Sequence, residues 1–134
     1  MFDAYLPQHD GLLPYYLLYC GISALAHSAV TYLNPIASLR QFSGPSAPAP
    51  NPLTAHVYGV KNVYTGLIRL YAAYHIGNPQ LYTLAQWTFV GVLVLYVGEL
   101  AIWKTVRLKE GAIPFVTAGL GILWMTMQRD WYLS

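Results

Sequence analysis

The chain has 134 residues, of which 56% are hydrophobic and only 9% are charged, and its mean hydropathy is +0.40. Soluble domains carry about 25% charged residues, so this composition is typical of an integral membrane protein. The net charge of only +2 and the scattered basic residues exclude the basic surface that nucleic-acid binding requires.

The first expected helix covers residues 12–33, an apolar stretch in which His27 is the one acidic or basic residue. Pro14 suits its first turn, where a missing amide hydrogen costs nothing. A signal peptide is the alternative interpretation of this stretch. It is disfavoured because Asp3 and Asp10 precede the stretch without any Lys or Arg, and because the apolar run is too long.

Residues 43–52 follow as a loop, because prolines within them remove amide donors and restrict the preceding residues. Residues 55–74 form the second expected helix, which is the least apolar of the set. Its polar residues include His56, Lys61, Asn62 and Arg69. The sequence at 75–80 contains Asn-Pro, which indicates a tight turn before the next helix.

The third expected helix covers residues 81–103, and Glu99 is its one acidic or basic residue. Trp87 and Trp103 lie near its two ends, where amphipathic rings favour the membrane interface. A charged link at 104–110 leads to a fourth helix at 112–133. The apolar part of that helix is short, so it reaches across a bilayer only if residues 128–133 continue it.

We therefore expect an all-α integral membrane protein, in which a small bundle of four transmembrane helices forms one domain over residues 1–134. The expected helices cover residues 12–33, 55–74, 81–103 and 112–133. The positive-inside rule places the loops before the second and fourth helices in the cytoplasm and both termini in the lumen. The basic residues behind this orientation are Arg40, Lys104, Arg107 and Lys109, against Arg129 at the C-terminus.

One stripe of the 55–74 helix is predicted to pack against a neighbouring helix. Its members at helical spacing are Gly59, Asn62, Gly66 and Arg69. Small residues let another backbone approach closely, and an amide can donate a hydrogen bond across the contact. Arg69 lies near the helix end, where a long side chain can extend to the interface. We also expect that this stripe could pair with a second copy of the chain.

Ionisable side chains on three helices are expected to share one layer. Counting outward from the 75–80 turn places His56 level with Glu99 and Lys61 deeper, while His27 belongs to the same leaflet. The favoured interpretation is structural: Glu99 pairs with Lys61 or His56 and fixes the helix register. The alternative is an acid/base pocket, because histidine and a desolvated lysine can exchange protons near neutral pH.

The sequence contains no recognisable catalytic motif and no metal-ligand spacing. Its single cysteine, Cys20, excludes an intrachain disulfide and a paired-cysteine metal site, and its apolar neighbours indicate a packing role. We therefore expect no metal and no cofactor.

From Leu53 to Leu133, in one uninterrupted register, the sequence resembles the ergosterol biosynthetic protein 28 family. The residues that carry the resemblance are Ala55-His56-Val57-Tyr58-Gly59, Ile68-Arg69-Leu70-Tyr71-Ala72-Ala73-Tyr74, Asn78-Pro79, Trp87-Thr88-Phe89, Glu99-Leu100, Trp124-Met125, Gln128 and Tyr132. The resemblance implies a multi-pass protein of the endoplasmic reticulum membrane. It further implies a scaffold that tethers enzymes of sterol C4-demethylation and other late sterol enzymes, without chemistry of its own.

Three departures from the family pattern lie around Glu99. His56 stands where the family has arginine, Lys61-Asn62 replaces a Trp-Thr pair, and Tyr96-Val97-Gly98 replaces a motif that contains histidine. These changes would convert a fixed Arg–Glu pair into a layer with titratable partners. They fit either drift in a paralogue with new tether partners or reassignment to proton transfer.

The leading hypothesis is therefore a non-catalytic scaffold for sterol or terpenoid biosynthetic enzymes. The second is a diverged member that is itself a cofactor-independent intramembrane isomerase or cyclase of a terpenoid substrate. In that case Glu99 is the general acid, His56 or His27 accepts the proton, and Lys61 stabilises negative charge. A lipid carrier without partner enzymes is the third hypothesis.

Overall fold

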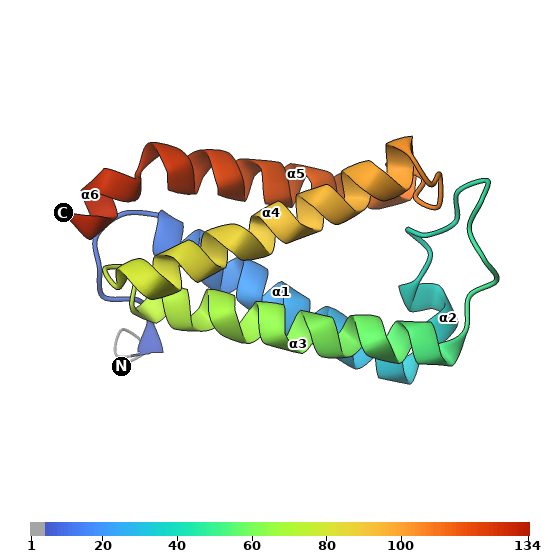
Figure 1. The fold of residues 1–134 in the computed structure, drawn as a ribbon. Coiled ribbons are helices and arrows are strands. Elements are labelled where there is room, and N and C mark those ends of the chain that lie inside the picture. The colour runs from blue at the N-terminus through green and yellow to red at the C-terminus, as the bar shows by residue number, and fades with distance from the viewer. Residues whose placement is uncertain (1–4) are drawn as a thin grey trace.

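The computed structural model describes residues 5–134, which fold into helices with no strand among them (Figure 1). The helices are α1 (Leu13–Leu33), α2 (Pro35–Ser38), α3 (Pro52–Tyr74), α4 (Pro79–Ala101), α5 (Leu108–Met127) and α6 (Arg129–Leu133). The all-α expectation is confirmed. Residues 1–4, which include Asp3 and the start of the expected domain, lie outside the described residues.

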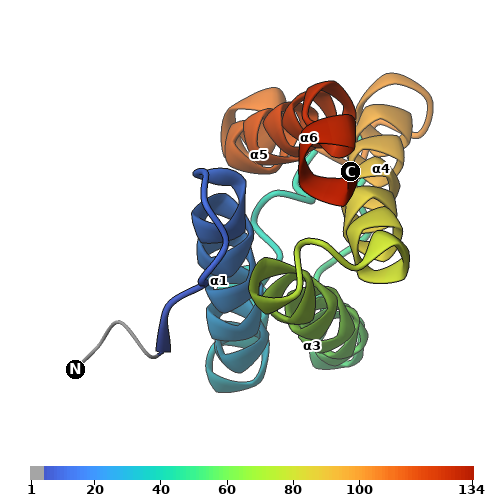
Figure 2. The same cartoon turned by 90° about the vertical axis from the view of Figure 1, so that its left-hand side faces the viewer.

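The four long helices form two pairs, seen end-on in Figure 2: α1 lies beside α3, and α4 lies beside α5. The helices α3 and α4 meet at the turn that joins them and diverge toward their other ends (Figure 1). The C-terminus and the start of α1 lie at the end of the molecule where this turn is found. The two helix pairs therefore lie farther apart at the end away from the turn between α3 and α4.

Prolines and asparagines fix where α3 and α4 begin. The Asn51 side chain accepts a hydrogen bond from the Thr54 amide at 2.9 Å, and Pro52 occupies the first turn of α3. Asn78 caps α4 in the same way, ahead of Pro79. Both helices thus begin two or three residues before the positions predicted from hydropathy, because a proline is favourable in a first turn.

The C-terminal region differs more from expectation. Residues 108–110, predicted as part of a charged link, form the first turn of α5. The predicted helix 112–133 is not continuous, because the backbone leaves helical geometry at Gln128 and α6 is a separate short helix. The α4 helix ends at Ala101, so Trp103 belongs to the loop that follows it.

Three helices are long and apolar enough to cross a membrane, namely α1, α4 and α5. The sequence predicted four such spans, and α3 does not meet the same criteria in the described part of the chain. Its polar residues, above all Lys61 and Arg69, lower its hydropathy. The composition and these three helices support a multi-pass membrane protein.

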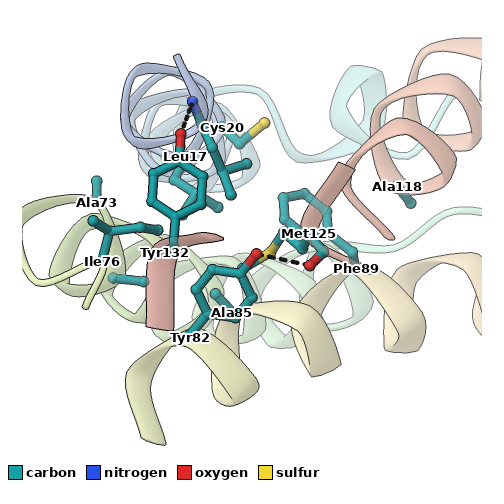
Figure 3. Packing of buried hydrophobic residues seen from close by; sticks show 12 residues of the cluster. Leu17, Cys20, Ala73, Ile76, Tyr82, Ala85, Phe89, Ala118, Met125 and Tyr132 are labelled. Carbon is teal, nitrogen blue, oxygen red and sulfur yellow. Dashed lines mark hydrogen bonds between the residues drawn. The ribbon is translucent and has the colours of Figure 1, made fainter. Parts of the chain in front are cut away.

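The apolar core lies toward the end of the bundle where α3 turns into α4, and Figure 3 shows its side chains from close by. Tyr82 and Phe89 of α4 are fully buried against Met125 of α5, and the Tyr82 hydroxyl donates a 2.7 Å hydrogen bond to the Met125 carbonyl. The Tyr132 hydroxyl of α6 accepts a 3.2 Å bond from the Leu13 amide at the start of α1. The first contacts join α4 to α5, and the Leu13–Tyr132 bond ties α1 to the C-terminal helix at this end.

At the opposite end, residues 39–51 form a segment that we call the strap, which runs from α2 past the α4–α5 loop to α3 (Figure 1). The Gly44 amide donates to the Thr105 carbonyl at 2.9 Å, and the Ser46 amide donates to the Lys104 carbonyl at 3.0 Å. A side chain at Gly44 would meet the Lys104 carbonyl oxygen at 2.4 Å, so this approach requires glycine. The strap therefore joins the diverging ends of the two helix pairs.

Candidate functional site

The space between the diverging helix pairs contains two adjoining cavities. The outer cavity has a volume of about 550 Å³ and lies between the strap, α3 and the end of α4. The inner cavity has a volume of about 280 Å³ and lies among α1, α3, α4 and α5. Tyr58 and Lys61 of α3 line both cavities, so these two side chains stand at their boundary.

The inner cavity gathers most of the polar side chains inside the bundle. These include His27, Tyr58, Lys61, Asn62, Arg69, Tyr96 and Glu110. The hydroxyls of Tyr58 and Tyr96 lie 2.8 Å apart and share a hydrogen bond between α3 and α4. The Lys61 ammonium donates to Asn62 Oδ1 at 3.2 Å and lies 4.9 Å from the centre of the Tyr58 ring.

Arg69 lies within the bundle and does not extend to the membrane interface, although its position near the end of α3 allowed that expectation. It is 6% exposed. Its Nε donates a 3.0 Å hydrogen bond to Thr88 Oγ1, and its guanidinium carbon lies 4.1 Å from the centre of the Phe89 ring. The side chain therefore joins α3 to α4 by a hydrogen bond and a cation–π contact.

Glu99 binds the loop that follows its own helix. Its Oε1 accepts a 2.7 Å hydrogen bond from the Thr105 hydroxyl, and its backbone carbonyl accepts one from the Thr105 amide at 2.7 Å. Within residues 5–134 the one ion pair joins Arg107 and Glu110, at 3.8 Å. The expected pairing of Glu99 with Lys61 or His56 is therefore absent from the described residues, although Glu99 and Lys61 line the same outer cavity.

The two histidines of the expected layer lie apart. His56 stacks on Tyr32 of α1, with ring centres 4.1 Å apart and planes nearly parallel, and it lines neither cavity. His27 lines the inner cavity, and its ring contacts Tyr58 edge to face at 5.8 Å. The His27 Nε2 atom is buried without a hydrogen-bond partner among residues 5–134. The four candidate catalytic residues are thus divided among three places.

The small residues of α3 pack against α1 of the same chain. A side chain at Gly59 would meet Thr31 Oγ1 at 2.0 Å, and one at Gly66 would meet the Gly21 carbonyl at 2.9 Å. Ser28 adds a 2.9 Å hydrogen bond to the Gly59 carbonyl. Because α1 covers this stripe, it is not available to a second copy of the chain, contrary to our expectation.

Asn62 also differs from the expected role. It is buried, but its hydrogen bond goes to Lys61 on its own helix and does not cross to a neighbour. Sequence reasoning missed Glu110, which lines the inner cavity because the first turn of α5 includes it. An acidic residue is favourable near a helix N-terminus, so this signal could have placed Glu110 in the helix.

These groups can hold a polar ligand by hydrogen bonds, because the cavity walls offer an ammonium, two phenols and a carboxylate. The described residues contain no cluster of three or more His, Cys, Asp or Glu side chains that could hold a metal ion. Cys20 is buried in the wall of the inner cavity and belongs to the apolar core.

The chain matches known proteins along its length. The family model described as "Erg28 like protein" matches residues 13–123. Ergosterol biosynthetic protein 28 of Candida albicans is 30% identical over 135 residues, which cover 99% of this chain and 97% of the relative. Its namesake in Gibberella zeae is 28% identical and covers 97% of this chain and 95% of the relative.

A third relative matches over a shorter part of the chain. The human ergosterol biosynthetic protein 28 homolog is 32% identical over 76 residues, which cover 56% of this chain and 54% of the relative. No solved structure matches the chain. The full-length matches confirm the resemblance that the motifs of α3, α4 and α5 carry. Since the family model covers residues 13–123, this chain belongs to the Erg28 family.

Proposed function

We propose that this protein is a non-catalytic scaffold of the endoplasmic reticulum membrane that tethers enzymes of sterol or related terpenoid biosynthesis. The observation that carries the proposal is the end-to-end match to relatives named ergosterol biosynthetic protein 28, which covers 99% of this chain and 97% of the Candida albicans protein.

The arrangement of polar groups supports a scaffold. The polar side chains of the bundle bind other parts of the same chain: Arg69 binds Thr88, Tyr58 binds Tyr96, and Glu99 binds Thr105. Such bonds fix the positions of helices and leave large apolar side chains on the outside. Leu33, Ile113 and Leu123 are examples, with exposures of 84%, 77% and 58%. These surfaces suit contact with lipid and with the helices of partner proteins.

We further propose that α3 crosses the membrane together with α1. The two helices pack along their lengths through Gly21, Gly59 and Gly66, and α3 returns from the strap to the end where the C-terminus lies. Because α3 packs between α1 and α4, it can carry polar residues inward, where they bind protein groups instead of lipid.

The isomerase or cyclase hypothesis has less support. It requires Glu99 to act with His56 or His27 on one substrate, yet His56 stacks on Tyr32 outside both cavities, and His27 and Glu99 line different ones. Of the four candidate catalytic residues, Lys61 alone lines both cavities.

Affinity purification from mildly solubilised membranes tests the scaffold directly. We expect the tagged chain to co-purify with sterol C4-demethylation enzymes or with other enzymes that act on lipophilic substrates, as identified by mass spectrometry. A chain that purifies alone under conditions that preserve a known membrane complex in the same extract would contradict the proposal.

Gene replacement separates the scaffold from the enzyme. Cells that lack the gene should accumulate C4-methylated sterol intermediates, and the Glu99→Gln variant should restore the profile at normal protein level. Glutamine keeps an oxygen that can accept from Thr105, so the fold is preserved. If Glu99→Gln is present at normal level and one uncyclised or unisomerised precursor still accumulates, the carboxylate is catalytic and the scaffold proposal fails.

A further inference from the structure

The outer cavity results from the arrangement of the helices and the strap, and not from the conformation of a single side chain. The helices α3 and α4 diverge from their shared turn, and the strap closes the wide end of the space between them (Figure 1). Backbone hydrogen bonds from Gly44 and Ser46 to the α4–α5 loop hold the strap in place. The resulting volume of about 550 Å³ lies within the range of about 300–1,000 Å³ that ligand pockets occupy.

Most of the cavity wall is apolar. Side chains from the strap, α3 and α4 contribute to it, among them Leu39, Phe42, Pro48, Leu53, Val57 and Leu95. The residues in the wall with polar groups include Tyr58 and Lys61 on α3, Glu99 on α4 and Thr105 in the loop that follows. This lining fits a lipophilic molecule that carries a polar group.

The polar groups in the wall have unused hydrogen-bonding capacity of both kinds. The Lys61 ammonium has three donors, and Asn62 Oδ1 is its one hydrogen-bond acceptor in the described part of the chain. The Thr105 hydroxyl donates a hydrogen bond to Glu99 Oε1, while residues 5–134 supply no hydrogen-bond partner for Glu99 Oε2. One cation and one anion line the cavity without an ion pair between them, so the wall has no net formal charge.

A hydroxyl group matches this wall better than the alternatives do. It can accept from Lys61 and donate to Glu99 at the same time. A carboxylate or phosphate could bind Lys61 but would be repelled by Glu99, and a ketone could accept but not donate. A hydrocarbon would cover the polar groups without satisfying them, which carries the full cost of desolvation.

We propose that the outer cavity binds a neutral lipophilic alcohol, with its hydroxyl between Lys61 and Glu99 and its apolar body against the strap, α3 and α4. This site lies in one chain and needs no partner enzyme. Its failure would therefore leave the scaffold proposal standing, because that proposal is tested by co-purification.

The test is photo-crosslinking of the purified full-length chain in lipid nanodiscs with a diazirine derivative of cholesterol that retains its hydroxyl. Competitors should separate the hydroxyl from the apolar body: cholesterol against cholestenone and cholestane, and geranylgeraniol against geranylgeranic acid. We expect the alcohol of at least one series to compete about tenfold better than its matched compounds. A tenfold difference in affinity is what one hydrogen bond to a charged group contributes. The series that competes identifies a polycyclic or a linear body.

Two valines on α3 supply matched variants. Both are exposed on the same helix, but Val57 lines the outer cavity and Val60 lines neither cavity. Val57→Trp should fill part of the cavity and reduce crosslinking at least about fivefold, while Val60→Trp should leave it unchanged. Lys61→Met should reduce the preference for the alcohol over the ketone or acid.

Three results would overturn the proposal. The first is equal competition by alcohol, acid and hydrocarbon, which would indicate partitioning into the surrounding lipid. The second is equal crosslinking of Val57→Trp and Val60→Trp when both variants are folded. The third is mapping of the crosslinked peptide, in the unmodified chain, to helix surfaces away from the strap, α3 and α4.

Discussion

Arg69 is held inside the bundle by the shape of its guanidinium as well as by its charge. The planar group lies over Phe89 at 4.1 Å while Nε donates to Thr88. A lysine at this position would keep the charge but lose the planar stacking and the fixed direction of the donor. Position 69 therefore requires the planar guanidinium of arginine and not only a positive charge.

We expect Arg69→Lys to lower the free energy of unfolding by about 2 kcal/mol, the usual contribution of a buried hydrogen bond to a charged group. Thermal unfolding of the detergent-solubilised protein measures this change. Arg107→Lys is the matched control, because Arg107 is an exposed residue whose ion pair with Glu110 contributes little. Equal stability of the two variants would contradict the proposed role of the guanidinium plane.

The bond between Glu99 and Thr105 gives a second prediction for single residues. Thr105→Val removes the hydroxyl that binds Glu99 Oε1 at 2.7 Å, so the free energy of unfolding should fall by about 2 kcal/mol, as for other hydrogen bonds to a charged group. Thr126→Val, at an exposed position of α5, should have little effect. In the Thr105→Val background, Glu99→Gln should cost less than it does in the unmodified chain. Additive effects of the two substitutions would show that the bond does not contribute to stability.

At the scale of elements, the contact between α1 and α3 depends on the absence of side chains. Gly59→Ala should lower the free energy of unfolding by about 1–3 kcal/mol, because the added carbon would lie 2.0 Å from Thr31 Oγ1. Gly91→Ala should instead be neutral or stabilising by up to about 1 kcal/mol, since nothing lies within 4 Å of that position and alanine favours helix. Thermal unfolding should show that Gly59→Ala lowers the stability of the chain, whereas Gly91→Ala leaves it unchanged or raises it.

A second-site change identifies the cause of the Gly59→Ala defect. Thr31→Ala removes the atom with which the new side chain collides, at the cost of the 2.6 Å bond from Thr31 to the Ser28 carbonyl. The double variant should therefore be more stable than Gly59→Ala alone. If Thr31→Ala and Gly59→Ala destabilise the chain additively, the close contact between the two helices is not the reason.

The long apolar runs were sufficient to predict α1, α4 and α5, because a bilayer span requires a continuous apolar stretch that is visible in sequence. The α3 helix was also predicted, although its polar residues make it the least apolar of the four long helices. Their ends were less predictable. Hydropathy did not predict that α3 begins at Pro52 and α4 at Pro79, because neither proline is part of an apolar run. Similarly, the charged residues 108–110 form a helical turn that hydropathy assigns to a loop.

Counting residues along the helices did not predict which side chains of the candidate site share a cavity. It placed His56 level with Glu99 and Lys61 deeper, yet Lys61 lines the outer cavity with Glu99 and His56 does not. It could not tell that His56 points to Tyr32 on the far side of α3, because height along a helix does not fix the direction in which a side chain points. Nor could it tell that α3 and α4 diverge, which separates residues that equal-height counting brings together.

At the scale of the whole molecule, the strap binds the α4–α5 loop, although these two loops lie far apart in sequence. Gly44 and Ser46 bind the carbonyls of Thr105 and Lys104, so both loops must lie on one face of any membrane that the bundle crosses. The turn between α3 and α4, and the C-terminus, lie at the opposite end (Figure 1). If α1 crosses the bilayer, α3 must return across it to reach that turn.

Labelling of single cysteines tests this topology in a Cys20→Ala background, which removes the native thiol. A membrane-impermeant maleimide added to sealed microsomes should modify Ser46→Cys and Arg107→Cys at once, because the basic loops are expected to face the cytoplasm. Gln80→Cys and Ser134→Cys should react only after detergent opens the vesicles. The reverse pattern would contradict the orientation but keep all four crossings. Reaction of Gln80→Cys together with Ser46→Cys would mean that α3 does not cross, since the two positions flank that helix.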